Sequence, residues 1–261
     1  MGRIIAVANQ KGGVGKTTTC TNLAASLGAR AQRVLLVDLD PQGNATMGSG
    51  VDKHECDPSA YDVLLGHAPA AEAVVNIEQS GYHLLPTGGD LTAAEVELIA
   101  LEGRERRLRE ALTPLRDNYD YVLIDCPPSL NMLTVNALVA ADSVLIPMQC
   151  EYYALEGLSA LLDTIERIAR AANPELTVEG VLRTMHDARN NLATDVSRQL
   201  ETHFGNRVYE TIVPRNVRLA EAPSYGLPAL YYDNTSRGAQ AYQALADEML
   251  ARAGIAAPAE A

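Results

Sequence analysis

The stretch NQKGGVGKTT, residues 9–18, follows a short apolar run and precedes a helical pattern near residues 17–29. A strand, a glycine-rich turn and a helix in this order are the setting in which such a motif binds phosphate. The helix N-terminus adds partial positive charge, and glycines let the backbone curl so that successive N–H groups point inward. The stretch therefore predicts a cradle for nucleotide phosphates, rather than a flexible turn with a solvated lysine.

The side chains of this loop indicate ATP with Mg²⁺ as the cofactors. Lys16 would place a full positive charge at the β- and γ-phosphates, and the Thr17 hydroxyl is placed to bind Mg²⁺. The residues expected to contact the nucleotide are those of the loop and the first helical turn: Lys11, Gly12, Gly13, Val14, Gly15, Lys16, Thr17 and Thr18.

Apolar runs alternate with helix-length amphipathic stretches along the chain, a pattern typical of an α/β fold. The expected strands are 4–8, 34–38, 83–86, 121–125, 143–147, 178–185 and 208–214. The expected helices lie near 17–29, 92–116, 130–140, 155–172, 190–203 and 236–253. Several strands are apolar without alternation, as in parallel sheets that are buried on both faces. We therefore expect a predominantly parallel, twisted sheet with helices on both faces, in one domain spanning 1–253 with a frayed tail at 254–261.

Two acidic sites follow apolar strands. VLLVDLDPQGN at 34–44 places Asp38 and Asp40 just past a strand, and YVLIDCPPS at 121–129 has the form of a Walker B strand that ends in Asp125. Carboxylates at this edge of an α/β sheet can bind Mg²⁺ or orient the water that attacks a phosphoryl group. We expect Asp125 to bind Mg²⁺, commonly through water, and a carboxylate at 38 or 40 to hold a metal-bound water or orient the attacking water. Either Asp38 or Asp40 could instead cap the following turn.

Composition bounds the other possibilities. The four cysteines form no CxxC pair, which favours reduced thiols over a disulfide framework or a structural metal site. No apolar stretch reaches the roughly 20 residues that a membrane span requires. The formal net charge of −12 taken alone argues against nucleic acid. However, the span 183–237 holds seven arginines and six acids, a net +1, so a local basic face is possible there.

One position departs from the usual template G-x-x-x-x-G-K-[ST]. Gln10 stands where the first glycine is expected, and Lys11 follows it. This form resembles the deviant Walker A motif of the ParA/MinD superfamily of P-loop ATPases. Longer strings resemble chromosomal ParA/Soj proteins over nearly the whole chain: CEYYALEGL at 150–158, IVPRNVRLAEAPS at 212–224 and YDNTSRGAQAY at 232–242.

The resemblance implies a chromosome-partitioning ATPase in the cytoplasm, associated with the nucleoid. In that family ATP closes a sandwich homodimer, and the extra lysine, here Lys11, reaches the partner's nucleotide. Lys11, Lys16 and Asp40 would then be the catalytic residues. Asp40 matches the switch I aspartate that orients the hydrolytic water, and it is also a candidate metal ligand. Asp38 resembles its structural or Mg²⁺-shell neighbour. The dimer binds double-stranded DNA without reading its sequence, and a ParB/Spo0J-type centromere-binding protein stimulates the hydrolysis that releases it. By resemblance alone, the adenine would be bordered by Met185, Pro214 and Asn216.

The same resemblance supplies candidate DNA contacts. Arg189 in the DAR segment and Arg218 in PRNVRL match basic positions of the family, and Arg215 and Arg237 are further candidates. Such binding rests on arginines and lysines at phosphates and should weaken steeply with salt. The alternative for each arginine is a surface salt bridge, because six acids lie in the same span.

Three other functions compete with this one. A MinD-like membrane switch requires a basic amphipathic C-terminal helix, whereas DEMLARAGIAAPAEA at 247–261 has Arg252 as its only base. A redox enzyme like the nitrogenase iron protein would need cluster ligands, and Cys126 and Cys150 do not lie in that family's cluster contexts. An amide-forming P-loop ligase is the third alternative, and the long ParA/Soj-like strings count against it. We therefore expect no membrane partner.

Overall fold

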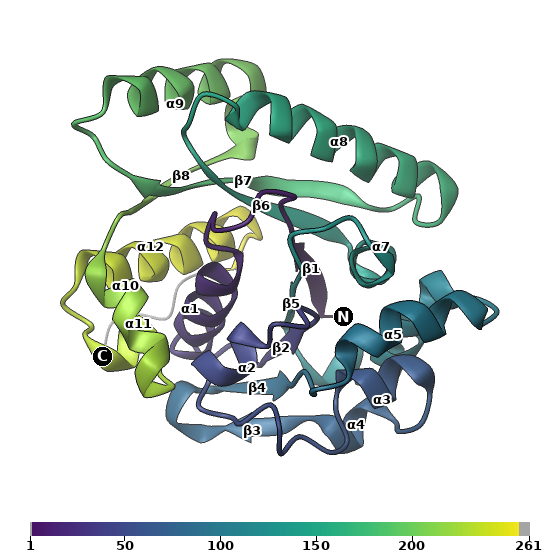
Figure 1. Ribbon diagram of the computed structural model, residues 1–261. Helices are drawn as coiled ribbons and strands as arrows, with labels where there is room; N and C mark the ends of the chain where they lie inside the picture. Colours follow the sequence, from purple (N-terminus) through teal and green to yellow (C-terminus); the bar gives the residue numbers. More distant parts are fainter. Residues whose placement is uncertain (1, 256–261) are drawn as a thin grey trace.

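Eight strands form one sheet in the computed structural model of the protein, which describes residues 2–255 (Figure 1). Their order is β3-β4-β2-β5-β1-β6-β7-β8, and all neighbours pair in parallel except β3 and β4, which are antiparallel. The strands are β1 (Arg3–Val7), β2 (Val34–Asp38), β3 (Val75–Ile77), β4 (Tyr82–Leu85), β5 (Tyr121–Asp125), β6 (Ser143–Gln149), β7 (Thr177–His186) and β8 (Val208–Pro214). The predicted fold class is confirmed.

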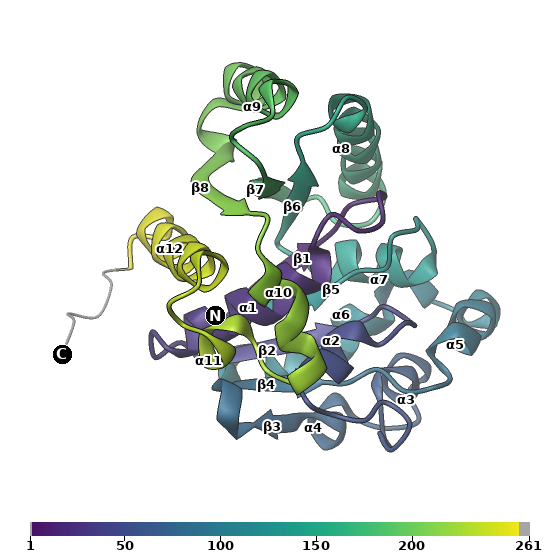
Figure 2. The ribbon, with the colours of Figure 1, turned by 60° about the vertical axis from the view of Figure 1, so that its left-hand side comes forward.

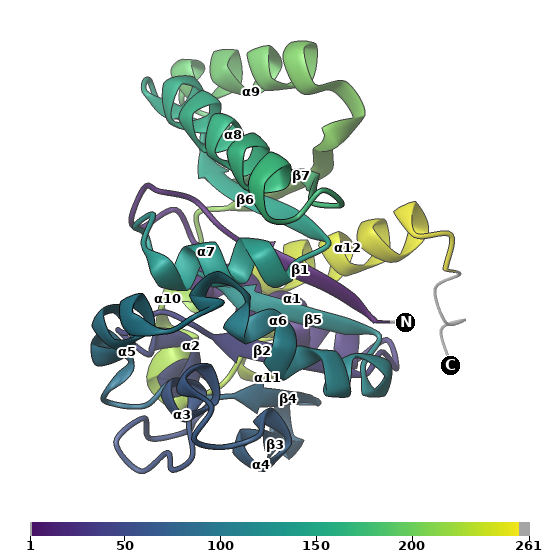
Figure 3. The ribbon, with the colours of Figure 1, turned by 90° about the vertical axis from the view of Figure 1, so that its right-hand side faces the viewer.

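Helices cover both faces of this sheet (Figures 1 and 3). One face packs against α1 (Lys16–Gly28), α2 (Asn44–Gly48), α10 (Val217–Glu221), α11 (Ala229–Tyr232) and α12 (Arg237–Arg252). The other packs against α3 (Ala60–Leu65), α4 (Ala70–Ala73), α5 (Leu91–Glu97), α6 (Arg107–Leu112), α7 (Met132–Ala140), α8 (Ala154–Ala171) and α9 (Asn191–Phe204). Six short 3₁₀ segments complete the described chain: Glu78–Ser80, Leu98–Ala100, Arg104–Arg106, Thr113–Asn118, Gly205–Arg207 and Ala222–Tyr225.

The apolar strands supply side chains to two separate cores, one on each face. In β1, Ile4 and Ala6 join the core under α7, whereas Ile5 and Val7 join the core under α1. Residues that alternate along a strand point to opposite faces, so a strand covered on both sides must be apolar at every position. This explains why the central strands carry no polar alternation.

The single helix expected at 92–116 is wrong. α5 ends at Glu97, Leu101 adopts an extended backbone with ψ of 142°, and Gly103 takes a left-handed conformation with φ of 65°. The helical path resumes only at α6, and Pro114 lies in the 3₁₀ segment that follows it. The other expected elements agree with the observed ones to within two residues.

The sequence analysis also missed β3 and five short helices, α2, α3, α4, α10 and α11. Each spans six residues or fewer, which is too short for hydrophobic periodicity to reveal. Of the tail expected at 254–261, residues 256–261 lie outside the described residues.

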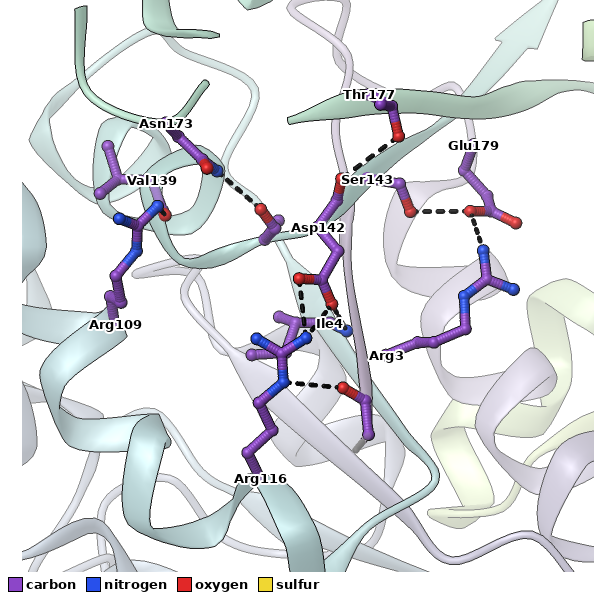
Figure 4. Close-up of polar contacts among 12 residues, drawn as sticks. Arg3, Ile4, Arg109, Arg116, Val139, Asp142, Ser143, Asn173, Thr177 and Glu179 are labelled. Carbon is purple, nitrogen blue, oxygen red and sulfur yellow. Dashed lines mark hydrogen bonds and ion pairs between the residues drawn. The ribbon is translucent and has the colours of Figure 1, made fainter. Parts of the chain in front are cut away.

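Polar groups at the edge where β1 and β6 begin bind one another (Figure 4). The Asp142 carboxylate accepts hydrogen bonds from Nη2 of Arg116, at 2.6 Å and 2.8 Å, and from the backbone N–H of Ile4 at 2.8 Å. Arg3 pairs with Glu179 at 2.6 Å. Each of these charged groups has a partner within the fold, so they stabilise the edge of the sheet opposite the phosphate loop. The candidate functional groups lie at the other edge, where the parallel strands end.

Candidate functional site

The turn between β1 and α1 forms an open cradle at the carboxyl edge of the sheet. Gly13 and Gly15 have φ angles of 72° and 88°, a region that glycine enters without steric strain. A Cβ atom added at Gly12 or Gly13 would meet no atom within 4 Å, so the space around these residues is open. Gly15 caps α1 without a side-chain hydrogen bond, which leaves the first N–H groups of the helix free for an anion.

Lys16 lies inside this cradle. Its residue is only 7% exposed, and its Nζ donates one hydrogen bond within residues 2–255, to the carbonyl oxygen of Lys11 at 3.3 Å. A buried ammonium is unfavourable unless an anion or several acceptors surround it. The surroundings of Lys16 therefore fit a phosphate group.

Asp125 lies at the end of β5, in register with Val7 of β1 and Asp38 of β2. It is fully buried, and its Oδ2 has no hydrogen-bond partner within the described residues. Burial raises the pKa of Asp125 well above its ordinary value and the Asp38 carboxylate adds to this, while the nearby Thr17 hydroxyl acts in the opposite direction. A cation at the free oxygen would offset this penalty, so Asp125 and Thr17 fit Mg²⁺.

Asp38 and Asp40 have different surroundings. The Oδ2 of Asp38 accepts hydrogen bonds from the backbone N–H and the hydroxyl of Thr46, both at 2.7 Å, and its Oδ1 accepts from the backbone N–H of Asp40 at 3.2 Å. Both oxygens are therefore engaged, and Asp38 ties α2 to the end of β2. The Oδ1 of Asp40 caps the turn by accepting from the N–H of Gln42 at 3.0 Å. Its Oδ2 accepts no hydrogen bond from the described residues and remains available for water or metal.

Lys11 pairs through its side chain with a residue outside the phosphate loop. Its side chain is 49% exposed and forms an ion pair with Glu151, which is 51% exposed, just past the end of β6. Its backbone N–H donates to Oδ1 of Asn9 at 3.0 Å, and Nδ2 of Asn9 donates to the carbonyl of Pro147 at 2.8 Å. The base of the loop is thus fastened to β6, while the Lys11 ammonium lies at the surface.

A cavity of about 360 Å³ opens beside the loop, and all three predicted adenine neighbours line it. Met185, the residue before the last of β7, has a φ of 47°, and Asn216 caps α10 by accepting from the N–H of Arg218 at 3.0 Å. The hydroxyl of Thr184 donates to the carbonyl of Val14 at 2.8 Å, which holds the phosphate loop against this cavity. The complete lining is Gly15, Thr18, Thr184, Met185, Val213, Pro214, Arg215, Asn216, Val217, Leu219, Ala220 and Tyr242.

Three of the four candidate DNA-binding arginines lie in the segment before α10, on α10 and at the start of α12, two helices that Figure 2 shows on the same face of the sheet as α1. Arg215 lines the cavity, Arg218 lies on α10, and Arg237 begins α12, whose Gly238 allows close approach of Leu219. A Cβ at Gly238 would lie 2.6 Å from Cγ of Leu219, so α10 packs directly on α12.

Arg189 lies in the loop that follows β7. The last residue of β7, His186, accepts a hydrogen bond through its carbonyl oxygen from the backbone N–H of Arg215, at 3.3 Å. The salt-bridge alternative also holds for two of the four. Arg189 pairs with Asp187 at 2.7 Å, and Arg218 pairs with Glu221 at 2.8 Å and Asp233 at 3.2 Å.

Several residues at this site were missed by sequence reasoning. Thr46 binds the Asp38 carboxylate, Thr184 binds the carbonyl oxygen of Val14, and Glu151 pairs with Lys11. Glu151 lies in the string CEYYALEGL at 150–158, but neither that string nor the sequence around Thr46 and Thr184 shows which residue each of them contacts.

Comparison of the sequence with known proteins gives the family of this chain. Residues 2–178 match the model of a family described as AAA domain. The chain is 51% identical to the chromosome partitioning protein ParA of Caulobacter vibrioides over 252 residues, covering 96% of this chain and 94% of the relative. It is also 51% identical to the sporulation initiation inhibitor protein Soj of Bacillus subtilis, covering 96% and 99%. The chain belongs to the ParA/Soj family of partition ATPases.

Among solved structures, cobyrinic acid a,c-diamide synthase from Mycobacterium smegmatis superposes with a TM-score of 0.84 and 38% identity, each chain being covered completely. That protein was crystallised with an ATP analogue and magnesium. The ParA/Soj assignment confirms the family that the loop and the longer strings indicated. The roles of the individual site residues stay predictions, and the geometry described above is consistent with them.

Proposed function

We propose that this ParA/Soj protein is an ATP-driven switch for DNA partition. In the proposed cycle, ATP and Mg²⁺ bind in the cradle, two copies close into a homodimer, and the dimer holds double-stranded DNA irrespective of sequence. Hydrolysis, stimulated by a ParB/Spo0J-type partner, releases the DNA. The protein would then act in the cytoplasm on the nucleoid, as one ATPase domain spanning 1–253.

The observation that carries the proposal is the contrast between the two lysines of the loop. Lys16 is buried in its own cradle, whereas Lys11 is half exposed and paired with Glu151. A lysine that does not serve its own phosphates is free to serve those of a facing copy. Exposed ion pairs are weak, so exchange of Glu151 for a phosphate requires little free energy.

The chain's own residues account for the steps of hydrolysis. Bound MgATP supplies the phosphoanhydride bond and the cation that neutralises its charge. Lys16 and the loop N–H groups would hold the β- and γ-phosphates, and Thr17 and Asp125 would hold the metal. Asp40 orients the attacking water through its free oxygen, and Lys11 from the facing copy stabilises the charge that develops on the phosphates. Met185, Pro214 and Asn216 enclose the adenine.

Sedimentation velocity with ATP, with ADP and without nucleotide tests the dimer. We expect dimers only with ATP, and dimers that form equally with all three would contradict the switch. Lys11→Ala should bind ATP as a monomer. The control variant Arg170→Ala removes an exposed cation that pairs with Glu166 on α8, and should still dimerise.

The relative named as a diamide synthase makes an amide-forming activity the competing proposal. Phosphate release from ATP in the absence of any acid or amine donor separates the two. A partition ATPase hydrolyses ATP alone and faster with DNA, whereas strict dependence on an acyl substrate would favour the synthase.

A further inference from the structure

Two carboxylates hold the guanidinium of Arg218. Its Nη1 lies 2.8 Å from Oε2 of Glu221, one turn along α10, and its Nε lies 3.2 Å from Oδ2 of Asp233, in the loop before α12. The Arg218 side chain is 49% exposed, so a phosphate from outside can reach the same guanidinium.

The other candidate arginines close to α10 and the start of α12 do not share these ion pairs. Arg215 and Arg237 are exposed, and neither forms an ion pair with the described residues. Arg183, although it belongs to the same basic span, is 4% exposed and donates to the carbonyl of Tyr209 at 2.7 Å, so it serves the fold. Arg218 is therefore a candidate DNA contact that is reachable and already neutralised by two acids.

We propose that Glu221 and Asp233 set the DNA affinity of this protein by competing with DNA phosphates for Arg218. This inference rests on the proposed DNA-binding function. Carboxylate and phosphate oxygens accept from a guanidinium in the same planar geometry, so a DNA phosphate that takes Nη1 and Nε of Arg218 must displace the acids.

The exchange explains why a single copy would bind DNA weakly. Exposed ion pairs are weak individually, but both must break before a DNA phosphate can take the Nη1 and Nε donors of Arg218. The closely spaced phosphates of the duplex and the doubled arginines of a dimer shift the exchange toward DNA. Glu221 and Asp233 thus keep one copy off DNA and make retention depend on the dimer.

The double variant Glu221→Gln/Asp233→Asn tests this on the full chain with ATP and a random-sequence duplex. The amides preserve size, and an asparagine at 233 retains the oxygen that accepts from the Thr235 hydroxyl, now at 2.7 Å. We expect DNA binding to strengthen roughly fivefold and the slope of log K against log salt to steepen by about 0.9 for each additional DNA phosphate that the protein neutralises. Glu221→Gln alone should give a smaller increase in the same direction and serves if the double variant misfolds.

Two controls separate competition from a general change of charge. Adding Arg218→Ala to the double variant should abolish the increase in affinity. Glu156→Gln/Asp163→Asn removes the same charge from exposed positions on α8 and should leave affinity nearly unchanged. An increase that persists without Arg218, an equal increase in the α8 control, or weaker binding by the double variant would each overturn the inference. If the unmodified protein with ATP does not bind DNA at all, the proposed function itself fails.

Discussion

Lys16 and Lys11 stand five positions apart in one loop and have opposite surroundings. Removing the buried Lys16 ammonium by Lys16→Ala should lower nucleotide affinity at least about a hundredfold, because the phosphates lose a desolvated charge partner. Lys11→Ala should leave that affinity within a few-fold, since its ammonium lies at the surface beside Glu151. Isothermal titration calorimetry with ATP and ADP measures both. Equal losses in the two variants would contradict the division of roles.

Asp40 has one carboxylate oxygen that accepts no hydrogen bond from the described residues, whereas both oxygens of Asp38 accept hydrogen bonds. Asp40→Ala should still bind ATP and accumulate the dimer, while hydrolysis slows by roughly a hundredfold or more because the water loses its orienting carboxylate. Phosphate release and sedimentation measure the two effects. Normal hydrolysis by Asp40→Ala would remove Asp40 from the mechanism.

At this scale the sequence predicted the loop well and its supports poorly. The loop follows a strand and opens a helix, so local sequence alone places Lys16, Thr17 and the glycines. The Walker B pattern likewise places Asp125, and the structure finds an oxygen of that residue without a hydrogen-bond partner among residues 2–255. Capping of the following turn was an alternative for Asp38, and its Oδ1 accepts from the N–H of Asp40. The contact of Asp38 with Thr46 and the pairing of Glu151 with Lys11 could not be predicted, because local sequence does not relate these residues.

The contact between α10 and α12 fixes the wall of the cavity. Gly238→Ala would push a Cβ to within 2.6 Å of Leu219 and 3.1 Å of Asn216, so α10 must shift. We expect a loss of about 1–3 kcal/mol in the free energy of unfolding, together with weaker ATP binding. Urea denaturation and nucleotide titration measure these two effects.

Gly157→Ala is the matched control, because a Cβ at this position within α8 meets no atom within 4 Å. It should be neutral or stabilising by up to about 1 kcal/mol, since alanine favours helix. A Gly238→Ala protein as stable as Gly157→Ala would show that α10 is not held by this contact.

Elements were predictable where they are long and periodic. α1, α8, α9 and α12 lie within two residues of their expected bounds. The expected helix at 92–116 failed because its composition is helical on both sides of a break made by Leu101 and Gly103. A break made by two backbone conformations leaves little trace in hydrophobic periodicity.

The whole molecule combines a net charge of −12 with a proposed affinity for DNA. The candidate arginines lie near the ends of β7 and β8 and where α10 meets α12, and most of the acids lie outside the span 183–237. Arg189→Glu/Arg218→Glu should keep ATP-dependent dimerisation and lose DNA binding, as seen by sedimentation with and without a duplex. Unchanged DNA binding would mean that the basic face lies elsewhere.

Membrane attachment is the alternative at this scale. No helix among residues 2–255 is long and apolar enough to cross a membrane. The apolar residues of α12 are buried against α1 and β8, among them Tyr242, Leu245 and Met249, so within the described chain this helix has no free apolar face for a lipid surface. Sedimentation with liposomes should therefore show no ATP-dependent binding, and binding would revive the membrane switch.

DNA binding measured against nucleotide and salt tests the central claim most directly. A fluorescent random-sequence duplex is titrated with the protein under ATP, ADP and no nucleotide, at about 50 mM and 200 mM salt. We predict binding with ATP only, and a roughly hundredfold loss at the higher salt if about four phosphate contacts are made. Binding that is equal in all three nucleotide states, or that does not change with salt, would contradict an ATP-driven switch that holds the DNA backbone.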